Sequence, residues 1–276
     1  MSESYFVWDV NKEIWHIFGA IGLRWYSLMF VGGFLLGTYM FGSFLRKEGK
    51  RDDYRDSLLM HMVLGTIIGA RLGHCLFYAP GYYFSNPLEI LKVWEGGLAS
   101  HGGYLGVALS IWIFSRKHKE LTFLWLTDRL CILSLMVGGF IRIGNFFNSE
   151  ILGKVAHVPW AVVFKQVDPL PRHPTQLYEA AGYLIISAIL YGIYRLADRK
   201  PLEGRILGFC FLFGFAFRVF IETFKENQEI FENDMTLNMG QVLSIPYILV
   251  GIILIIGVQK IPCCNRTVLK ESTGKR

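Results

Sequence analysis

Long apolar runs separated by short polar connectors dominate the chain. Seven runs are long enough to cross a hydrocarbon layer ~30 Å thick, which takes about 20 helical residues. Stretches such as "YLIISAILYGIY" and "PYILVGIILIIGV" lack the alternation of polar and apolar residues that is typical of transmembrane barrel strands. The pattern predicts an all-α polytopic membrane bundle whose seven transmembrane helices lie at 18–41, 57–79, 98–115, 122–147, 177–197, 205–224 and 239–259.

The composition agrees with this pattern. Of 276 residues, 53% are hydrophobic, 15% aromatic and only 18% charged, which is more apolar than the core of an ordinary soluble domain requires. We find no internal repeat or low-complexity segment, so we expect residues 1–276 to form a single integral membrane domain. Gly65, Gly69 and Gly73 lie on one face of the second predicted helix, and this spacing favours close helix packing.

The positions of lysine and arginine orient the predicted bundle. Connectors 42–56, 116–121 and 195–205 and the tail from Lys260 together carry 17 basic residues, whereas the N-terminal segment and the other connectors carry 6. Basic loops remain in the cytoplasm, so we expect the N-terminus outside and the C-terminus inside. The pI near 9.0 then reflects a basic cytoplasmic face that meets anionic lipid heads, and we expect no nucleic acid partner. The first residues lack a cleavable signal pattern, so the first span is expected to remain as an anchor.

Arginine is the only basic residue type within the predicted spans apart from histidine. A buried arginine costs at least ~2.5 kcal/mol at a helix centre, so a partner is required. The planar guanidinium forms two hydrogen bonds with a phosphate or carboxylate, and an oxyanion ligand is therefore one interpretation. An internal ion pair is the other, with Asp128 as the partner of Arg129 and Glu222 as the partner of Arg218. Apart from Arg195 and Arg205, which we count with the connector 195–205, the arginines within the spans are Arg24, Arg71, Arg129, Arg142 and Arg218.

Most of these polar positions fall in the outer half of the membrane once the helices are oriented. On the fourth predicted helix, Arg142, Asn145 and Ser149 share one face by helical periodicity. This arrangement predicts a polar cavity in the outer leaflet that can hold a phosphate head group. The other positions at this depth are Arg24, Tyr26, Arg71, His74, His101, Arg218 and Glu222.

His101 opens the third predicted helix and is followed by two glycines. A histidine near a membrane surface is commonly a structural residue, but the glycines allow a backbone or a ligand to approach closely. Both interpretations remain open for His101. The five cysteines show no metal-ligand spacing, and we expect neither a metal nor a cofactor.

Several segments resemble the prolipoprotein diacylglyceryl transferases, a family of bacterial inner-membrane enzymes. "GGFIRIGNFFNSEILGK" at 138–154 resembles the family signature, and the other similar segments occur in family order along essentially the whole chain. They are "RWYSLMF", "GARLGHCLFY", "HGGYLG", "RHPTQLYEA", "RVFIETFKE" and "MGQVLSIP". The resemblance implies transfer of the sn-1,2-diacylglyceryl group of phosphatidylglycerol to the lipobox cysteine thiol of a prolipoprotein signal peptide. By the same resemblance, a thioether would form and glycerol phosphate would be released, and we expect no cofactor and a site in the outer (periplasmic) half of the cytoplasmic membrane.

The resemblance also implies roles for individual residues. Arg142 and Asn145 would hold the lipid head group, Gly153 would let a loop close over it, and His101 would be the base for the thiol, with Glu150 and Glu222 as alternatives. The predicted catalytic residues are His101, Arg142, Glu150, Arg218 and Glu222. The predicted substrate-binding residues are Tyr26, Arg71, Arg142, Asn145 and Gly153.

Three positions depart from the family pattern, the first being Phe213, where family members often have tyrosine. Lys154 and Lys225 stand where the family commonly has arginine. A lysine supplies the positive charge but cannot form the bidentate hydrogen bonds of a guanidinium.

One other class of function competes. A transporter or channel for an organic anion would also use buried arginines. It would require a polar route through both halves of the membrane, and the inner half offers mainly His61, Asp128 and Arg129.

Overall fold

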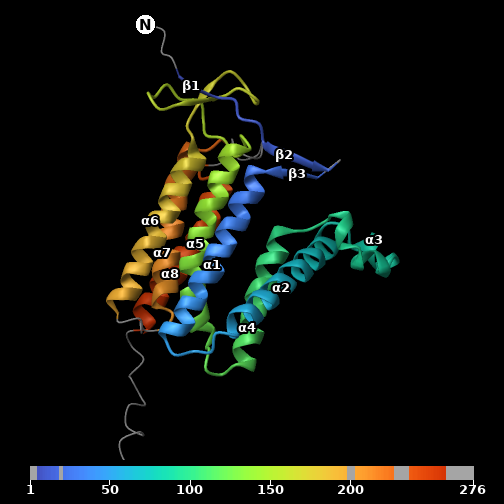
Figure 1. Cartoon of the computed structure of the whole chain (residues 1–276), viewed down its shortest axis with the longest axis vertical. Helices are drawn as coiled ribbons and strands as arrows, with labels where there is room; N and C mark the ends of the chain where they lie inside the picture. Colours follow the sequence, from blue (N-terminus) through green and yellow to red (C-terminus); the bar gives the residue numbers. More distant parts are fainter. Residues whose placement is uncertain (1–4, 19–20, 198–202, 227–235, 259–276) are drawn as a thin grey trace, which may run out of the picture. The chain divides into compact units, whose positions relative to one another are not determined.

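Long helices form most of the protein, which we describe from a computed structural model over residues 5–18, 21–197, 203–226 and 236–258 (Figure 1). The chain divides into two compact units. The first contains Met1–Phe30 and Gly138–Arg276, and the second contains Val31–Val137. Helices α1 (Trp25–Lys47) and α5 (Phe123–Phe147) each contribute residues to both units. That residues 1–276 form one integral membrane domain stays a prediction.

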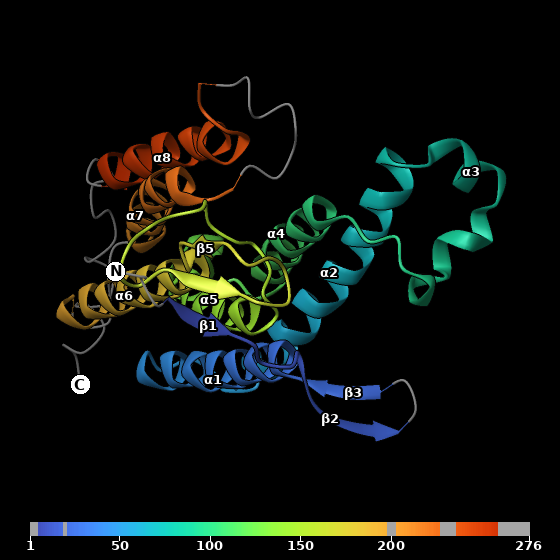
Figure 2. The same ribbon diagram turned by 90° about the horizontal axis from the view of Figure 1, so that it is seen from above.

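Three apolar helices, the start of α1 and the end of α5 make up the helical part of the first unit. The three helices are α6 (Thr175–Leu196), α7 (Arg205–Ile221) and α8 (Met239–Val258), and the 3₁₀ turn η3 (Glu222–Phe224) continues α7. Helix α7 packs against both α6 and α8, and α7 and α8 lie side by side (Figure 2). Gly208 and Gly251 let the backbones of α7 and α8 approach closely, because a methyl group at either would meet the opposite backbone within 3.0 Å.

Short strands follow the C-terminal end of α5 in the same unit. Strand β1 (Phe6–Trp8) pairs in parallel with β4 (Val162–Phe164), and β4 pairs antiparallel with β5 (Pro171–Arg172). Phe146, Val162 and Phe164 form a buried cluster under this sheet, with Trp8 and Leu152 packed against it. The sheet therefore supports the loop that follows α5.

The second unit is built on the pair α2 (Tyr54–Phe77) and α4 (Ser100–Lys117). Between them lie the short helix α3 (Pro80–Ser85) and the 3₁₀ turns η1 (Pro87–Leu91) and η2 (Val93–Glu95). Gly65, Gly69 and Gly73 of α2 face Gly102 and Gly106 of α4, with backbone against backbone. The packing role predicted from the glycine spacing is confirmed.

This contact predicts a strong response to added volume. A methyl group at Gly69 would lie 2.8 Å from the Cα of Gly106 and would also contact the carbonyl oxygen of Gly102. Gly69→Ala is therefore expected to lower the free energy of unfolding by roughly 1–3 kcal/mol, because a packed interface must open. Gly32→Ala in α1 is the control, since that position has open space. Thermal unfolding in detergent measures both, and equal midpoints would contradict the backbone contact.

The prediction of a helical, multi-pass membrane protein is confirmed. Among the described residues, six helices are long and apolar enough to cross a membrane, namely α1, α2, α5, α6, α8 and α7 with η3. Helix α4 matches the predicted third span in position, but its serines, its glycines, His101 and the basic pair Arg116 and Lys117 lower its mean hydropathy. The end of the last predicted span, residue 259, lies outside the described residues.

The predicted start of the first span was wrong. A helix was expected over 18–41, but α1 begins at Trp25, and a hairpin of β2 (Glu13–Phe18) and β3 (Ile21–Arg24) precedes it. Antiparallel pairing and the ion pair of Glu13 with Arg24 close the hairpin, and β-branched residues favour strand. Arg24 therefore lies outside the helix. Helix α1 extends to Lys47 because Phe44 and Leu45 are buried in the last turns.

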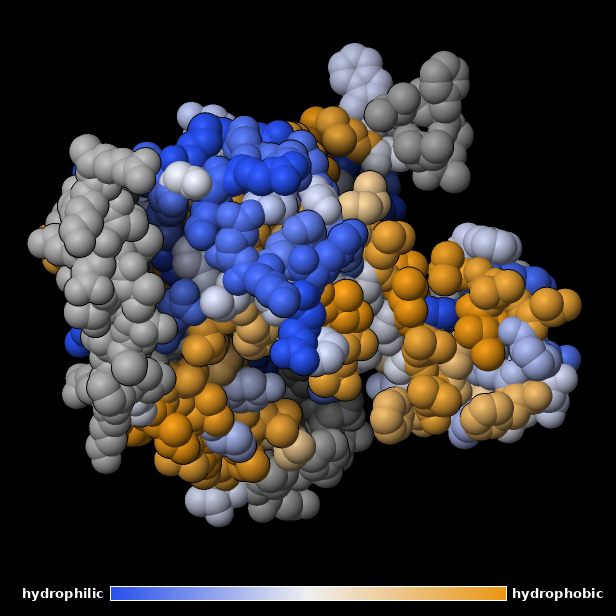
Figure 3. Space-filling model, turned by 90° about the horizontal axis from the view of Figure 1, so that it is seen from below, coloured by the Kyte–Doolittle hydropathy of each residue, from blue (hydrophilic) through white to orange (hydrophobic). Residues whose placement is uncertain are grey.

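Charged connectors gather at one end of the second unit. The segment after α1 carries ion pairs of arginine with aspartate, and Lys50 donates a hydrogen bond to the carbonyl oxygen of Glu120 in the connector between α4 and α5. A hydrogen bond from Arg51 holds the pKa of Asp53 below its ordinary value. Figure 3, a view from below, shows hydrophilic residues gathered in one patch of this face, with hydrophobic residues on either side of it.

Candidate active site

The last turns of α5 and the turn that follows them carry three polar side chains, of which Asn145 contacts both Arg142 and Glu150. Nη1 of Arg142 donates to Oδ1 of Asn145 over 3.1 Å, and Nδ2 of Asn145 donates to Oε1 of Glu150 over 2.7 Å. Asn148 also donates to this carboxylate, over 3.3 Å. Arg142 and Asn145 are three residues apart and so share one helical face, as predicted. A guanidinium, an amide and a carboxylate are therefore connected at the end of an apolar helix.

The turn after α5 has an unusual backbone. Ser149 and Ile151 have positive φ angles of 53° and 58°, so Glu150 lies between two left-handed residues. A left-handed conformation costs free energy for residues other than glycine, and such strained residues cluster at functional sites. Gln176 donates to the carbonyl oxygen of Glu150 over 2.7 Å. Ser149 was predicted to continue the helical face of Arg142, but α5 ends at Phe147, so Ser149 belongs to this turn instead.

Tyr26 lies beside this helix. It is in the first turn of α1, and a methyl group at Gly144 would lie 3.0 Å from Cδ2 of Tyr26 and 3.1 Å from its Cα. Gly144 directly precedes Asn145, and the absence of a side chain there lets the start of α1 pack closely on α5. The predicted substrate-binding residues Tyr26, Arg142 and Asn145 thus come from adjacent turns of α1 and α5.

Gly153 is buried in a crowded loop. Its amide donates to the carbonyl oxygen of His173 over 3.2 Å, and its carbonyl oxygen accepts from Arg172 over 3.1 Å. Arg172 also forms ion pairs with Asp168 and Glu226. The hydrogen bond from Arg172 is the main cause that lowers the pKa of the Asp168 carboxyl. Arg172 thus ties the loop at Gly153 to Asp168 and Glu226.

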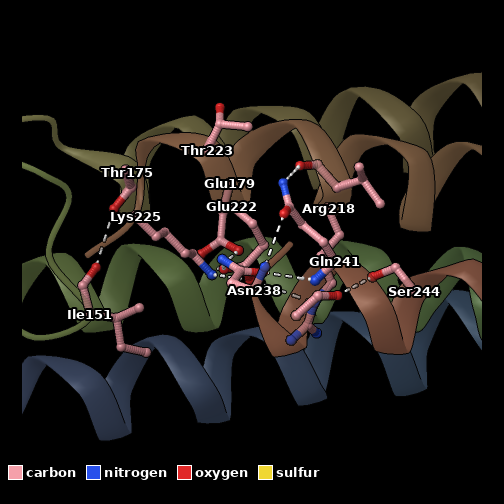
Figure 4. A network of polar contacts seen from close by, with 12 residues as sticks. Ile151, Thr175, Glu179, Arg218, Glu222, Thr223, Lys225, Asn238, Gln241 and Ser244 are labelled. Atoms are coloured by element: carbon pink, nitrogen blue, oxygen red, sulfur yellow. Dashed lines mark hydrogen bonds and ion pairs between the residues drawn. The ribbon is translucent and has the colours of Figure 1, made fainter. Parts of the chain in front are cut away.

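The end of α7 carries the second arginine. Nε of Arg218 lies 3.7 Å from Oε1 of Glu222 one turn later, and the Arg218 side chain is 42% exposed. Glu222 is buried, and its Oε2 accepts from Nδ2 of Asn238 over 3.2 Å. Figure 4 shows these side chains together with Lys225 and Gln241. The ion pair of Arg218 with Glu222, one of the two interpretations of this arginine, is present.

Sequence reasoning missed Glu179. Its carboxylate is fully buried in α6, where Oε2 lies 3.0 Å from Nε of Arg142 and Oε1 lies 2.9 Å from Nζ of Lys225. The available signal was an acidic residue within the predicted span 177–197, since a carboxylate in an apolar helix requires a cationic partner. Through these two ion pairs, Glu179 links Arg142 of α5 with Lys225, which follows α7 and η3.

The second unit holds the other predicted residues. His101 is exposed in the first turn of α4, and Gly102 beside it packs on the backbone of α2, so that glycine serves helix packing. Arg71 is buried and donates to the carbonyl oxygens of Glu89, Ile90 and Gly96. That His101 and Arg71 belong to one site with Arg142 stays a prediction.

Arg129 is a structural residue in the same unit, as the ion-pair interpretation predicted. The predicted ion pair with Asp128 is present, and Glu48 is a second, closer partner. Glu48 accepts two hydrogen bonds from Arg129, of 3.1 Å and 2.7 Å, whereas the nearest oxygen of Asp128 lies at 3.8 Å. The guanidinium also stacks over the ring of Trp125.

Comparison with known sequences identifies the family. The sequence model of the prolipoprotein diacylglyceryl transferases matches residues 12–257. This chain belongs to that family. The match includes the signature segment and every predicted site residue, so the polar cluster at the end of α5 lies in the part of the chain that defines the family.

Curated relatives agree with this assignment. The phosphatidylglycerol–prolipoprotein diacylglyceryl transferase of Tolumonas auensis is 47% identical over 238 residues, which cover 86% of this chain and 92% of the relative. Proteins with the same name from Chloroherpeton thalassium and Bacteroides fragilis are 42% and 41% identical. They align with 92% and 89% of this chain, and with 94% and 92% of their own lengths. The protein is thus a member of a transferase family with membrane-spanning helices.

Proposed function

We propose that this protein transfers the sn-1,2-diacylglyceryl group of phosphatidylglycerol to the cysteine thiol of a lipobox in a prolipoprotein signal peptide. The observation that carries the proposal is the connected row of Arg142, Asn145 and Glu150 at the end of α5, in the family signature. An arginine and an amide side by side suit a phosphodiester, since both donate hydrogen bonds to its oxygens. Tyr26 packs on α5 at Gly144, next to Asn145, and Gly153 lies in the loop that follows Glu150.

The proposed reaction is a displacement at the glycerol carbon that carries the phosphate. The cysteine sulfur forms a C–S bond, the C–O bond to phosphate breaks, and glycerol phosphate leaves with the bonding electrons. The leaving group gains a second negative charge, so guanidinium groups fixed near its oxygens lower the barrier. Arg142 and Arg218 supply this charge, and Arg71 is a further candidate for head-group binding. No cofactor takes part in these steps.

The thiol must lose its proton before it attacks well, because its ordinary pKa is about 8.5. We propose His101 as the base, with Glu150 and Glu222 as alternatives. An imidazole with an ordinary pKa of about 6.5 is mostly neutral at pH 7 and can accept the proton. The carboxylate oxygens of Glu222 are already contacted by Arg218, Lys225 and Asn238, which leaves them less available to take the thiol proton.

The direct test is a transfer assay. The purified protein is incubated with phosphatidylglycerol and a lipobox peptide, and the peptide mass and the release of glycerol phosphate are measured. We expect the peptide to gain one diacylglyceryl group for each glycerol phosphate released. A transporter or channel for organic anions would release no glycerol phosphate, and an unchanged peptide mass would contradict the proposal.

We further propose seven transmembrane spans in the bacterial cytoplasmic membrane, with the N-terminus outside, the C-terminus inside and the site in the outer half. Helix α4 is the seventh span, in addition to the six helices of sufficient length and apolar content. Reporter fusions after residues 50, 118 and 200 are expected to be cytoplasmic, because the basic connectors lie there. Export of any of the three reporters would contradict the topology.

His101→Gln is expected to lower the turnover of transfer by about 100-fold, because a general base acts in the chemical step. Binding of phosphatidylglycerol should change much less, and raising the pH should restore part of the rate by ionising the thiol in solution. The measurements are kcat and KM for phosphatidylglycerol between pH 6 and pH 9. His157→Gln, at a histidine that contacts Tyr5 in the outer loop, is the control. Wild-type turnover of His101→Gln would leave the two glutamates as candidates.

A further inference from the structure

Lys225 lies at the centre of a buried polar network that the proposed reaction does not use. Its side chain is only 4% exposed, and its Nζ lies 2.9 Å from Oε1 of Glu179 and 3.2 Å from Oε1 of Glu222. Two buried carboxylates thus share one lysine (Figure 4). A charge in such surroundings requires a partner, because desolvation costs several kcal/mol for each ion.

Each carboxylate also contacts one of the two site arginines. Oε2 of Glu179 pairs with Nε of Arg142, and Oε1 of Glu222 is the atom nearest to Nε of Arg218. The charges therefore alternate along one continuous row, in the order Arg142, Glu179, Lys225, Glu222 and Arg218. Three cations and two carboxylates leave a net positive charge of one. Lys225 and Glu179 are buried, whereas the arginines at both ends are partly exposed.

The backbone holds Lys225 in this position. Residues 224–226 pair with residues 152–154, with hydrogen bonds from the amide of Lys154 to the carbonyl oxygen of Phe224 and from Glu226 to Leu152. Gly153 and Lys225 form the bridge between the two segments. Lys225 is thereby fixed to the loop that follows the signature helix, and its side chain points toward α6.

We propose that Lys225 is a positioning residue that sets the geometry and charge of the two arginines through their shared carboxylates. The inference rests on the proposed function, in which Arg142 and Arg218 face the lipid phosphate. Without Lys225 the row has two cations and two carboxylates and is neutral. Each carboxylate would then move toward its arginine and compete with the phosphate for the guanidinium N–H groups.

The test compares Lys225→Met with Lys225→Arg. Lys225→Met is expected to lower kcat for transfer by about 10-fold to 100-fold, because a displacement of the reacting groups on the order of 1 Å costs about 100-fold. KM for phosphatidylglycerol should rise less than kcat falls, because the arginines act mainly on charge that develops in the reaction. Lys225→Arg should recover most of the turnover, since it restores the cation.

Lys165→Met is the matched control. It also removes a lysine from an ion pair, with Asp9, but on the exposed surface of the outer loop, and wild-type turnover is expected. All rates are divided by the amount of folded enzyme in the monodisperse fraction. A purely structural lysine would lower that amount and leave kcat for each folded molecule unchanged, and this result would overturn the inference.

A second variant decides the question if Lys225→Met does not fold. A methyl group at Gly240 would lie 2.7 Å from Cδ of Glu222 and 2.8 Å from Oε1, so Gly240→Ala displaces this carboxylate and keeps every charge. Reduced kcat of the folded variant supports the inference, and wild-type kcat overturns it. Absence of transfer by the wild-type protein would instead overturn the proposed function. Transfer by the wild type with full kcat of Lys225→Met would overturn only the role of Lys225.

Discussion

Arg142→Lys is expected to insert and fold normally and to lose about 99% of the transfer rate, since the loss of one donor to a developing oxyanion costs about 100-fold or more. An ammonium group keeps the charge but cannot contact Glu179, Asn145 and a phosphate together, as the planar guanidinium can. The Arg142 side chain is 20% exposed, so a substrate can reach it. The measurement is the transfer rate for each folded molecule.

Arg129→Lys provides the contrast for this prediction. The forked hydrogen bonds from Arg129 to Glu48 are buried, so this substitution should lower the unfolding temperature and leave the rate of each folded molecule near that of the wild type. A lowered unfolding temperature of Arg142→Lys with a wild-type rate would mean that Arg142 is a scaffold residue. The phosphate would then bind elsewhere, with Arg218 and Arg71 as the next candidates.

Gly153→Ala is expected to abolish most of the activity without loss of the helical fold. An added methyl group would lie 2.7 Å from Cβ of His173 and 2.8 Å from Cγ2 of Thr175, and both neighbours are fixed by backbone hydrogen bonds. The loop must therefore move, and it carries the bridge to Lys225 with it. A shift on the order of 1 Å lowers the rate by about 100-fold. The transfer assay measures this effect, with circular dichroism as the check on the fold.

Gly192→Ala is the matched control, because a methyl group at this position of α6 meets open space. It removes a glycine from the same unit and should leave the rate unchanged, with equal or higher stability, since alanine favours the helix. If Gly153→Ala retained the wild-type rate, the close packing of the signature loop would have no part in the reaction.

Periodicity and apolar content predicted the helices well, because a helix that crosses the membrane requires an uninterrupted apolar run of about 20 residues. The predicted span 122–147 differs by one residue from α5, and the pairing of Arg142 with Asn145 followed from their spacing of three residues. The hairpin before α1 was missed because an apolar strand pair reads like the start of a span. The antiparallel pairing of β2 with β3 and the ion pair of Glu13 with Arg24 close the hairpin, and both contacts require the folded chain.

The polar network could not be predicted, because its members come from distant parts of the chain. Glu179 is 37 residues from Arg142 and 46 residues from Lys225 in the sequence, and periodicity relates only residues on one helix. Glu48, the closer partner of Arg129, was missed for the same reason, whereas the ion pair with the adjacent Asp128 was predicted correctly. Residue type indicated that partners were required, and tertiary packing determined which ones.

The pairing of β1 with β4 has a consequence for the order of events during synthesis. Phe6 is paired with Val162, so the sheet under the signature loop cannot form until more than half of the chain has left the ribosome. Contacts between such distant residues form slowly, because a long loop must close first. The helix pair α2 and α4, by contrast, is complete by residue 117. We therefore expect the second unit to assemble early and the turn around Glu150 to be among the last parts to acquire its final conformation.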